Sequence, residues 1–489
     1  MLTKQNWVER AENVEVEWRA FIDGSYVEAQ SGKTREKINP ADGSVLANVA
    51  DCEAADVDLA VAAARKAFES GEWAESGPRH RREVLVAFAD LIVAHTEELA
   101  LLITLDMGKP ISDSIGEVGS SARAVRFYAE AIDKVAGQVM PTEPEFVTLV
   151  TKEAAGVAAC ITPWNYPLSQ VCQKIAPALA VGNSVLLKPS ERAPLVAIRL
   201  AALAAEAGIP AGVLNVLPGL GSTAGQAISL HMDVDKISFT GSTGVGKKLL
   251  QAAGQSNLKS VSLECGGKSP NIVHRDARGL EEVAKVAAEV AFVNQGEMCN
   301  AGTRLLVHED IYDEFMGHLA AASQGWLPGD PLDPTAKTGA MVDAAHVAAV
   351  SSYVESGLSE GAKIVVGGKS EGNYFEPTIF EGVSNSMRIA SEEIFGPVLS
   401  VIKYSSLDEA IRIANDTQYG LAAAIWTTDL HTAHSASRKL RAGVVYVNCY
   451  DVAEMSTPFG GFKQSGLGRE KSLMAMEEFS ETKSTWIKF

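Results

Sequence analysis

The chain has 489 residues, of which 46% are hydrophobic and 21% charged, so neither a disordered protein nor a membrane protein is indicated. At roughly 100 to 200 residues per domain, this length predicts about two or three domains. The formal net charge of -18 argues against nucleic-acid binding, which needs basic patches to neutralise phosphates. The composition is that of a globular protein.

Cysteine usage and the N-terminus predict a cytoplasmic protein. The six cysteines include no CxxC pair and are too few for a disulfide scaffold. The N-terminal segment MLTKQNWVERAENVEVEW is charged and has no apolar signal-peptide core. No run of the sequence reaches the roughly 18 apolar residues of a membrane span. We therefore expect a reduced compartment, no membrane partner and no metal site.

The N-terminal part is predicted to be a hairpin followed by helices. Asp23 and Gly24 lie between two apolar runs and predict a tight turn, because both residue types tolerate positive φ. Helical periodicity then covers Glu53–Phe68, Arg81–Met107 and Ile111–Val135.

From Phe146 onward, strands alternate with helices. β-rich runs between Phe146 and Thr162 come first. The next predicted strands are Ser184–Leu187, Val213–Val216, Lys236–Phe239 and Ser260–Leu263, and the helices between them are Pro167–Ala180, Leu195–Ala207 and segments that begin near Thr223 and Val245. This alternation predicts a parallel sheet with helices on both faces, which binds ligands at the carboxyl ends of its strands.

The rest of the chain continues the α/β pattern. A helix is predicted over Leu280–Gln295, with Gly296 suited to end it. Alternation resumes through Tyr446, and the chain finishes in the β-like tail SETKSTWIKF. Such a tail needs a strand edge to pair with, on another domain or on another subunit.

Four stretches that each end a predicted strand suggest a nucleotide site: ITPWNYP, LKPSE, LPGLGSTAG and FTGSTGVGKK. Glycines permit close approach of a phosphate, and a following helix offers free N–H groups. Any one stretch alone is more typical of an ordinary tight turn, but four at successive strand ends favour a site. A P-loop is rejected, because Lys248 stands where a serine or threonine should bind magnesium. The candidate cofactor residues are Ile161, Thr162, Pro163, Trp164, Lys188, Ser190, Glu191, Gly221, Gly225, Phe239, Gly241, Ser242 and Gly246.

Polar residues in two of these stretches suggest specific tasks. Lys188 and Glu191 can hold ribose hydroxyls, and the carboxylate would repel a ribose phosphate, which favours NAD over NADP. The alternative is a solvated loop with an ion pair. The amide of Asn165 could donate to an oxyanion, although a lone asparagine more often satisfies turn backbone.

Cys299 and Glu264 form the candidate catalytic pair. Cys299 lies in the polar, glycine-rich loop NQGEMCNAG, unlike a cysteine of an apolar core. Glu264 ends a predicted strand and is followed by Gly266 and Gly267, which permit close approach of a ligand. A cysteine that attacks a carbonyl needs a base to activate water afterwards. No histidine is close to Cys299 in sequence, so a Cys-His protease is unsupported.

These motifs, together with EEIFGPV and PFGGFKQSGLGRE, closely resemble those of the aldehyde dehydrogenase superfamily, and the resemblance covers the chain from about Phe21 to its end. It implies a Rossmann-like NAD-binding domain at residues 1–135 and 153–263 and a catalytic α/β domain at 264–480. A β oligomerisation flap is implied at 136–152 and 481–489, with assembly as a homodimer or homotetramer.

The resemblance also implies residue roles. Cys299 resembles the nucleophile, Asn165 and the Cys299 N–H the oxyanion hole, and Glu264 the base that releases the acid. Members that pass the acyl group to coenzyme A typically lack this base, so hydrolysis is favoured. Glu393 and Phe395 match residues that hold the nicotinamide ribose. Lys188, counted also among the catalytic residues, matches a position at the adenosine ribose with Glu191, while Gly241 and Ser242 match positions at the pyrophosphate.

The substrate is predicted from the least certain positions. Tyr166, Gln170 and Gln173 share one face of a predicted helix, and Glu454 and Phe459 lie in a loop that resembles the substrate-contacting segment of the family. Their polarity suggests a polar or cationic aldehyde, and the wider sequence is similar to the bacterial branch acting on γ-glutamyl-γ-aminobutyraldehyde and on amino- or guanidinobutyraldehydes. A broad aliphatic aldehyde dehydrogenase, a coenzyme A-acylating enzyme and a non-enzymatic protein on this fold remain as alternatives.

Overall fold

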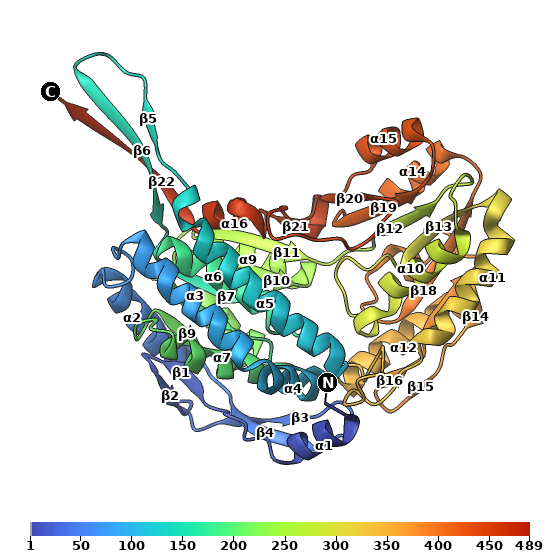
Figure 1. The fold of residues 1–489 in the computed structure, drawn as a ribbon, viewed down its shortest axis with the longest axis horizontal. Helices are drawn as coiled ribbons and strands as arrows, with labels where there is room; N and C mark the ends of the chain where they lie inside the picture. Colours follow the sequence, from blue (N-terminus) through green and yellow to red (C-terminus); the bar gives the residue numbers. More distant parts are fainter. Residues whose placement is uncertain (1) are drawn as a thin grey trace.

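The computed structural model describes residues 2–489, which form two lobes and a projecting arm (Figure 1). One lobe contains an eight-stranded sheet and the other a seven-stranded sheet. The chain leaves the first lobe after β11 (Ser260–Cys265) and returns to it near the C-terminus, where β21 (Gly466–Leu467) pairs with β11. The predicted α/β class is confirmed.

The first sheet has the strand order β2-β1-β9-β8-β7-β10-β11-β21, and β9, β8, β7, β10 and β11 are parallel. Its remaining strands are β1 (Ala20–Ile22), β2 (Ser25–Val27), β7 (Val157–Ile161), β8 (Ser184–Lys188), β9 (Leu214–Val216) and β10 (Lys236–Gly241). In β7, Val157 and Ala159 pack on one face and Ala158 and Cys160 on the other. A strand buried on both faces reads as a continuous apolar run, which is why β7 was recognisable.

Helices cover both faces of this sheet. On the face of Ala158 lie α3 (Pro78–Ala94), α4 (Thr96–Met107), α5 (Ile111–Ala131), α6 (Ser169–Val181), α7 (Leu195–Glu206) and α16 (Ser472–Glu478). On the opposite face lie α2 (Ala54–Glu69), a π-helical turn (Gly221–Gly225) that leads into α8 (Gln226–Leu230), and α9 (Thr243–Gln255).

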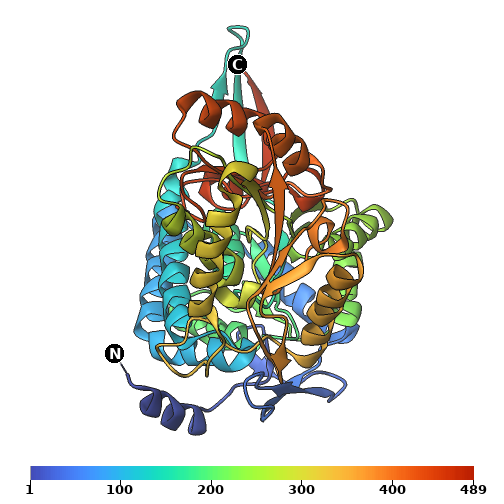
Figure 2. The same cartoon turned by 90° about the vertical axis from the view of Figure 1, so that its right-hand side faces the viewer.

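The second sheet has the order β14-β17-β18-β13-β12-β19-β20, and only its edge strand β14 is antiparallel to its neighbour. The strands are β12 (Pro270–Val273), β13 (Arg304–His308), β14 (Lys363–Val366), β17 (Thr378–Glu381), β18 (Val398–Tyr404), β19 (Ala422–Trp426) and β20 (Val444–Val447). One face is covered by α10 (Leu280–Phe292) and α11 (Tyr312–Ser323), and the other by α12 (Ala344–Ser359), α13 (Arg388–Ser391), α14 (Leu407–Asn415) and α15 (Leu430–Lys439) (Figure 2).

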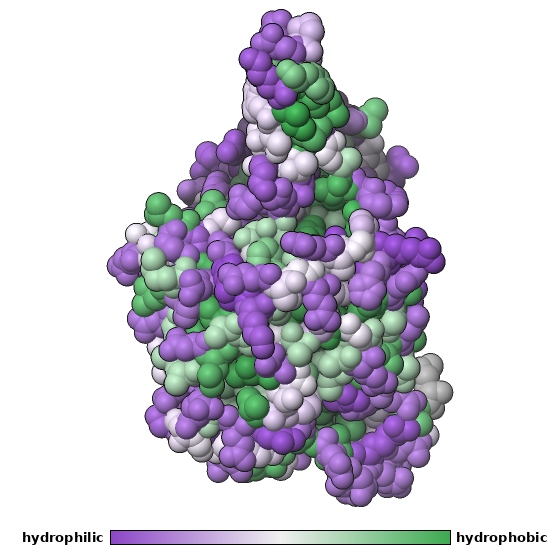
Figure 3. All heavy atoms as spheres, turned by 90° about the vertical axis from the view of Figure 1, so that its left-hand side faces the viewer, coloured by the Kyte–Doolittle hydropathy of each residue, from purple (hydrophilic) through white to green (hydrophobic). Residues whose placement is uncertain are grey.

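The arm is a three-stranded antiparallel sheet of β5 (Gln138–Met140), β6 (Phe146–Ala154) and β22 (Ser480–Lys488). The C-terminal tail thus pairs with β6 of its own chain along its whole length. Val139, Trp486 and Phe489 are 72%, 62% and 81% exposed, and apolar atoms are visible on the arm in Figure 3. Further elements are α1 (Lys4–Glu12), the hairpin of β3 (Thr34–Ile38) and β4 (Val45–Ala50), and the hairpin of β15 (Ser370–Glu371) and β16 (Tyr374–Phe375).

The hairpin at Asp23 and Gly24 is confirmed, with φ of 50° and 79°, but the single helix predicted over Arg81–Met107 is wrong. It is two helices, α3 and α4, because the backbone leaves helical geometry at His95 (φ −99°, ψ 23°). The His95 imidazole contacts Glu98 at 2.7 Å, so a local side-chain bond stabilises the break.

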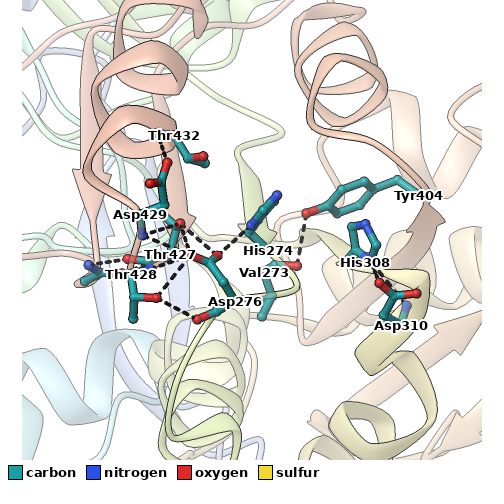
Figure 4. A network of polar contacts seen from close by, with 11 residues as sticks. Val273, His274, Asp276, His308, Asp310, Tyr404, Thr427, Thr428, Asp429 and Thr432 are labelled. Carbon is teal, nitrogen blue, oxygen red and sulfur yellow. Dashed lines mark hydrogen bonds and ion pairs between the residues drawn. The ribbon is translucent and has the colours of Figure 1, made fainter.

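A carboxylate in the second lobe joins two strands and a helix (Figure 4). Asp276 follows β12 and accepts hydrogen bonds from the Thr427 hydroxyl at 2.8 Å and from the Thr428 and Asp429 backbone N–H groups at 3.0 and 2.9 Å, where β19 leads into α15. His274 Nδ1 lies 2.6 Å away. Burial opposes the charged form, but these hydrogen bonds outweigh it and lower the pKa of Asp276.

Within residues 2–489, no helix is long and apolar enough to cross a membrane. The division into an NAD-binding domain, a catalytic domain and a flap at the boundaries given above stays a prediction.

Candidate active site

The ends of four parallel strands lie side by side at one edge of the first sheet. β7 ends at Ile161, β8 at Lys188, β10 at Gly241 and β11 at Cys265. Ile161 pairs with Lys188, and Gly241 with Cys265. The predicted cofactor stretches and Glu264 are therefore neighbours at the edge where open α/β sheets bind ligands.

Cys299 follows a tight turn that the periodicity of the sequence did not predict. The helix expected over Leu280–Gln295 ends at Phe292, and Asn294 and Gln295 have φ of 50° and 57°. The Asn294 amide donates to the carbonyl of Asn165 at 3.1 Å and to that of Glu297 at 3.2 Å. These bonds stabilise left-handed backbone that helical periodicity cannot indicate.

The electrostatics around Cys299 disfavour its ionised form. Cys299 is half-buried, and burial raises the pKa of its thiol well above the usual value, with further increases from the carboxylates of Glu264 and Glu393. A β-carbon on Gly267 would lie 2.8 Å from the Cys299 carbonyl oxygen, so the end of β11 and the cysteine loop are in close contact. The candidate nucleophile and the candidate base thus share one site.

Asn165 lies beside the cysteine loop, and its side-chain amide donates only one of its two N–H groups to that loop. Its side chain is buried and donates from Nδ2 to the Glu297 carbonyl at 2.8 Å. A primary amide has two N–H hydrogens, so the second can donate elsewhere. This arrangement suits a donor to an oxyanion formed at Cys299.

Glu264 is buried with an unsatisfied carboxylate. Within residues 2–489, its Oε1 atom has no hydrogen-bond partner. Burial raises the pKa of Glu264 well above the ordinary value, and the nearby carboxylate of Glu470 raises it further. A carboxyl group with a raised pKa and free lone pairs is suited to accept a proton from water.

An ion pair near Glu264 escaped the sequence analysis. Lys174 of α6 pairs with Glu470, which also accepts from the Thr240 hydroxyl at 3.2 Å. Lys174 and Glu470 are 296 residues apart in sequence, and although Glu470 ends the motif PFGGFKQSGLGRE, no local pattern connects it with Lys174. Only the tertiary fold brings them together.

A second buried ion pair fixes the loop that carries Asn165. Lys109 pairs with Glu117, and both side chains are 1% exposed. The Glu117 carboxylate accepts from the N–H groups of Leu168 and Ser169 at 2.9 and 3.0 Å, where α6 begins. The Lys109 ammonium lies 3.7 Å from the centre of the Tyr166 ring, so this pair orients the start of α6 and the residue next to Asn165.

Lys188 and Glu191 lie together beyond β8. The Lys188 ammonium donates to the Pro189 carbonyl at 2.9 Å and lies 3.4 Å from the Glu191 carboxylate. Burial lowers the pKa of Lys188, and Glu191 opposes that shift. The Ser190 hydroxyl accepts from the Arg192 N–H at 3.3 Å. These contacts group Lys188 with the candidate cofactor residues rather than with Cys299.

The candidate glycines differ in their surroundings. A β-carbon on Gly241 would lie 2.5 Å from the Phe239 ring, and one on Gly246 would lie 3.1 Å from Cys265 Sγ. Gly221 and Gly225 bound the π-helical turn, and a β-carbon on Gly221 would meet nothing within 4 Å. Gly246 therefore serves close packing of α9 on the sheet, whereas Gly221 is open to a ligand.

The other candidate cofactor residues surround the same edge. Ser242 caps α9 through the Val245 N–H, while the side chains of Ile161 and Phe239 pack in the core. Pro163 is half-buried in the loop after β7. The buried Thr162 hydroxyl has no partner within residues 2–489.

Glu393 and Phe395 approach this edge from the second lobe. Glu393 accepts from the Gly267 N–H at 3.2 Å, and a β-carbon on Gly266 would overlap its carboxylate. Burial raises the pKa of Glu393 to about 7. The Phe395 ring meets the Trp164 ring edge-on at 5.3 Å, so residues from both sheets meet here.

All five candidate substrate residues line one cavity of about 540 Å³ together with Cys299. They are Tyr166, Gln170, Gln173, Glu454 and Phe459. Gln173 donates to the Ser169 hydroxyl at 2.8 Å, whereas the buried Gln170 Oε1 has no partner within residues 2–489. The sequence analysis missed another part of the lining, a face of α5 that includes Ser120, Arg123, Phe127 and Glu130. Their spacing of three, four and three residues places them on one face of a helix, and this was the signal in the sequence that could have identified them.

Residues 2–489 contain no group of three His, Cys, Asp or Glu side chains placed to hold a metal ion. All six cysteines are free.

Comparison with known proteins places the chain among close relatives. Residues 26–485 match the model of the aldehyde dehydrogenase family. NADP/NAD-dependent aldehyde dehydrogenase PuuC of Escherichia coli K12 is 50% identical over 484 residues, 98% of each chain. Two solved structures cover the whole of both chains: γ-glutamyl-γ-aminobutyraldehyde dehydrogenase from Burkholderia cenocepacia J2315 (54% identity, TM-score 0.98), and the indole-3-acetaldehyde dehydrogenase AldA of P. syringae with NAD+ and IAA (55% identity, TM-score 0.99).

Proposed function

The chain belongs to the aldehyde dehydrogenase family, and we propose that its NAD-dependent oxidation of aldehydes proceeds through a covalent adduct on Cys299. The predicted aldehyde dehydrogenase fold is confirmed. In the proposed reaction, the Cys299 thiolate attacks the aldehyde carbon and forms a thiohemiacetal. The oxyanion accepts hydrogen bonds from the free Asn165 N–H and from the Cys299 backbone N–H.

The residues at the strand edge fit NAD. The unpartnered Thr162 hydroxyl, the open Gly221 and the half-exposed Glu191 form a polar edge, and Glu393 faces it from the second lobe. Glu191 would hold the hydroxyls of the adenosine ribose and repel a phosphate there, which favours NAD over NADP. Glu393 would hold the nicotinamide ribose. NAD held there would supply the hydride acceptor, so that loss of hydride from the thiohemiacetal carbon would leave a thioester on Cys299.

Glu264 then completes the reaction. Its unsatisfied carboxylate accepts a proton from water, and the resulting hydroxide attacks the thioester and releases the carboxylic acid and the Cys299 thiolate. The end of β11 and the cysteine loop are in contact, so the base and the acyl group can share one water. This free carboxylate favours hydrolysis over transfer of the acyl group to coenzyme A.

The substrate we propose is a polar, amino-type aldehyde of polyamine catabolism, such as γ-glutamyl-γ-aminobutyraldehyde. The observation that carries this proposal is the unpartnered Oε1 of Gln170, a residue that lines the cavity of Cys299, because a buried acceptor without a partner disfavours a purely apolar substrate. An ammonium or amide N–H group would satisfy it. The names of the Escherichia coli and Burkholderia relatives support the same class.

A substrate panel with NAD tests this proposal. We expect γ-glutamyl-γ-aminobutyraldehyde or 4-aminobutanal to give a higher kcat/KM than hexanal, benzaldehyde or indole-3-acetaldehyde. A Gln170→Leu variant should lose part of this preference, since it replaces the free acceptor with an apolar group of similar size. A higher kcat/KM for hexanal or benzaldehyde in the wild type would contradict the proposal, and NADH formation that depends on coenzyme A would favour the acylating alternative.

We also infer that the chain forms a homodimer or homotetramer through its arm and acts in the cytoplasm. Val139, Trp486 and Phe489 are largely exposed on the arm, and exposed apolar groups of this size are typical of contact surfaces. The free cysteines fit a reduced compartment. Sedimentation of the wild type beside Trp486→Glu tests the assembly, and an unchanged mass for both would contradict this use of the arm.

A further inference from the structure

One wall of the substrate cavity carries charged side chains on a regular face of α5. Arg123, Phe127 and Glu130 all line the cavity, and Arg123 and Glu130 are exposed. Tyr166, Gln170, Gln173 and Cys299 are less exposed, so the charged groups lie toward solvent and the nucleophile lies deeper. The tail of a bound aldehyde would meet the charged groups.

The charges of this cavity balance. Its lining includes three cationic and three anionic side chains, so it has no net charge to attract a tail of one sign. The cationic residues are Arg123, Arg126 and Lys471, and the anionic residues are Glu130, Asp451 and Glu454.

Half of these groups already have partners in the protein. Arg126 pairs with Asp90, Asp451 accepts from the Asn300 amide at 2.7 Å, and the Lys471 ammonium lies 5.0 Å from the centre of the Phe459 ring. Within residues 2–489, the side chains of Arg123, Glu130 and Glu454 form neither an ion pair nor a hydrogen bond. One guanidinium and two carboxylates are therefore free to bind a ligand.

We propose that Arg123 and Glu454 form a binding site for an α-amino acid group at the far end of the aldehyde, with Arg123 on its carboxylate and Glu454 on its ammonium. This inference rests on the proposed function and narrows it from amino-type aldehydes to zwitterionic ones. A guanidinium matches a carboxylate in a two-point hydrogen bond. Glu130 is a poorer partner for the ammonium, because seven helical residues separate it from Arg123 by about 10 Å.

A tail of a single charge suits this cavity less well. Arg123 would repel a tail that carries only an ammonium group, and Glu454 would repel one that carries only a carboxylate. An α-amino acid group satisfies both, while the buried Gln170 acceptor can bind an amide N–H deeper in the cavity. The three polar groups thus match a chain with an aldehyde, an internal amide and a zwitterionic end.

The test is steady-state kcat/KM for four aldehydes that differ in the charge of the tail: γ-glutamyl-γ-aminobutyraldehyde (zwitterion), 4-aminobutanal (cation), succinic semialdehyde (anion) and butanal (neutral). For Arg123→Gln we expect kcat/KM for the zwitterion to fall by about 10- to 100-fold, chiefly through KM, the loss expected for one hydrogen bond between charged groups. The kcat/KM for butanal should be unchanged, and that for 4-aminobutanal should rise. For Glu454→Gln, kcat/KM should again fall for the zwitterion, and it should rise for succinic semialdehyde.

Arg82→Gln is the matched control, because Arg82 is an exposed arginine of α3 outside the cavity. It should leave all four values unchanged. An equal fall for every aldehyde in Arg123→Gln, or no fall for the zwitterion, would overturn the inference. If the wild type prefers 4-aminobutanal to the zwitterion, the inference fails while the proposed function stands. If butanal exceeds both amino aldehydes, the proposed function fails with it.

Discussion

Two carboxylates at the ends of parallel strands have opposite surroundings. Asp276, after β12 in the second lobe, accepts hydrogen bonds from Thr427, Thr428 and Asp429 and contacts His274. Glu264, at the end of β11 in the first lobe, is buried, and its Oε1 has no partner in the part of the chain that the structure describes. The pKa of Asp276 is lowered and that of Glu264 is raised.

The difference shows where the fold leaves polar atoms for a reaction. Bonds to Asp276 join β12 to the start of α15, so they stabilise the ionised carboxylate and the second lobe. Glu264 lacks such bonds, and two other unsatisfied buried atoms, Thr162 Oγ1 and Gln170 Oε1, belong to candidate cofactor and substrate residues. Unsatisfied buried groups cost stability, so the presence of these three at candidate catalytic, cofactor and substrate residues is consistent with binding and catalysis there.

The largest expected effect is a loss of activity without a loss of stability when the candidate nucleophile is removed. Cys299→Ala should lower kcat by about 10⁶-fold, as for loss of the nucleophile in a covalent catalyst. It should leave Tm and NAD binding unchanged, since the thiol makes no structural hydrogen bond in the described residues. Activity assays with calorimetric titration of NAD check both, and appreciable residual activity would refute the role of Cys299.

For Asp276, whose carboxylate accepts several hydrogen bonds, we expect the reverse: a loss of stability without a loss of activity. Asp276→Asn should lower the free energy of unfolding by about 1–3 kcal/mol, because several donors lose a charged acceptor, while kcat stays unchanged. The measurement is the urea midpoint at pH 7. Asp408→Asn is the control, because the Asp408 side chain is 87% exposed and its ion pair with Lys439 contributes little. Equal midpoints for the two variants would contradict the account.

The stabilisation by Asp276 should also depend on pH. Its folded-state pKa lies below the unfolded-state value of about 3.9, so the contribution is fully present above that value and is lost as the pH falls below it. The difference in urea midpoint between wild type and Asp276→Asn should therefore be constant from pH 7 to 5 and narrow below pH 4. A difference in urea midpoint that widens as the pH falls would contradict the lowered pKa of Asp276 in the folded state.

The smallest expected effect concerns the thiol of Cys299. Burial raises its pKa, and an ionised Glu264 raises it further. Glu264→Gln should thus speed alkylation by iodoacetamide by up to about tenfold at pH 9, which corresponds to one pKa unit, and this gain should shrink as the pH falls and the Glu264 carboxylate becomes protonated. Slower alkylation in the variant at pH 9 would mean that Glu264 deprotonates the thiol instead.

Strand ends and chemistry-bearing loops could be predicted from the sequence because their signals are local. A strand buried on both faces, such as β7, reads as an apolar run, and glycines mark the loop after it. The turn of Asn294 and Gln295 could not be predicted, since its bonds run to Asn165 and Ala340 elsewhere in the chain. The break at His95 was missed because apolar periodicity continues across it.

Contacts between residues distant in sequence were the other feature that could not be predicted. The ion-paired residues Lys174 and Glu470 come from segments that no local pattern connects, and Arg123 lines the same cavity as the predicted substrate residue Glu454 although it lies in a distant part of the sequence. Their burial, or their place in the cavity of Cys299, distinguishes them from the many surface charges of an acidic chain.

The central claim is that Glu264 acts after hydride loss, on the thioester. Rapid mixing of Glu264→Gln with NAD and aldehyde tests it most directly. We predict a burst of one NADH per active site, followed by turnover slower than that of the wild type by about 10²- to 10⁴-fold, the usual contribution of a general base. A variant with no burst would place Glu264 before the oxidation, and an unchanged kcat would remove it from the mechanism.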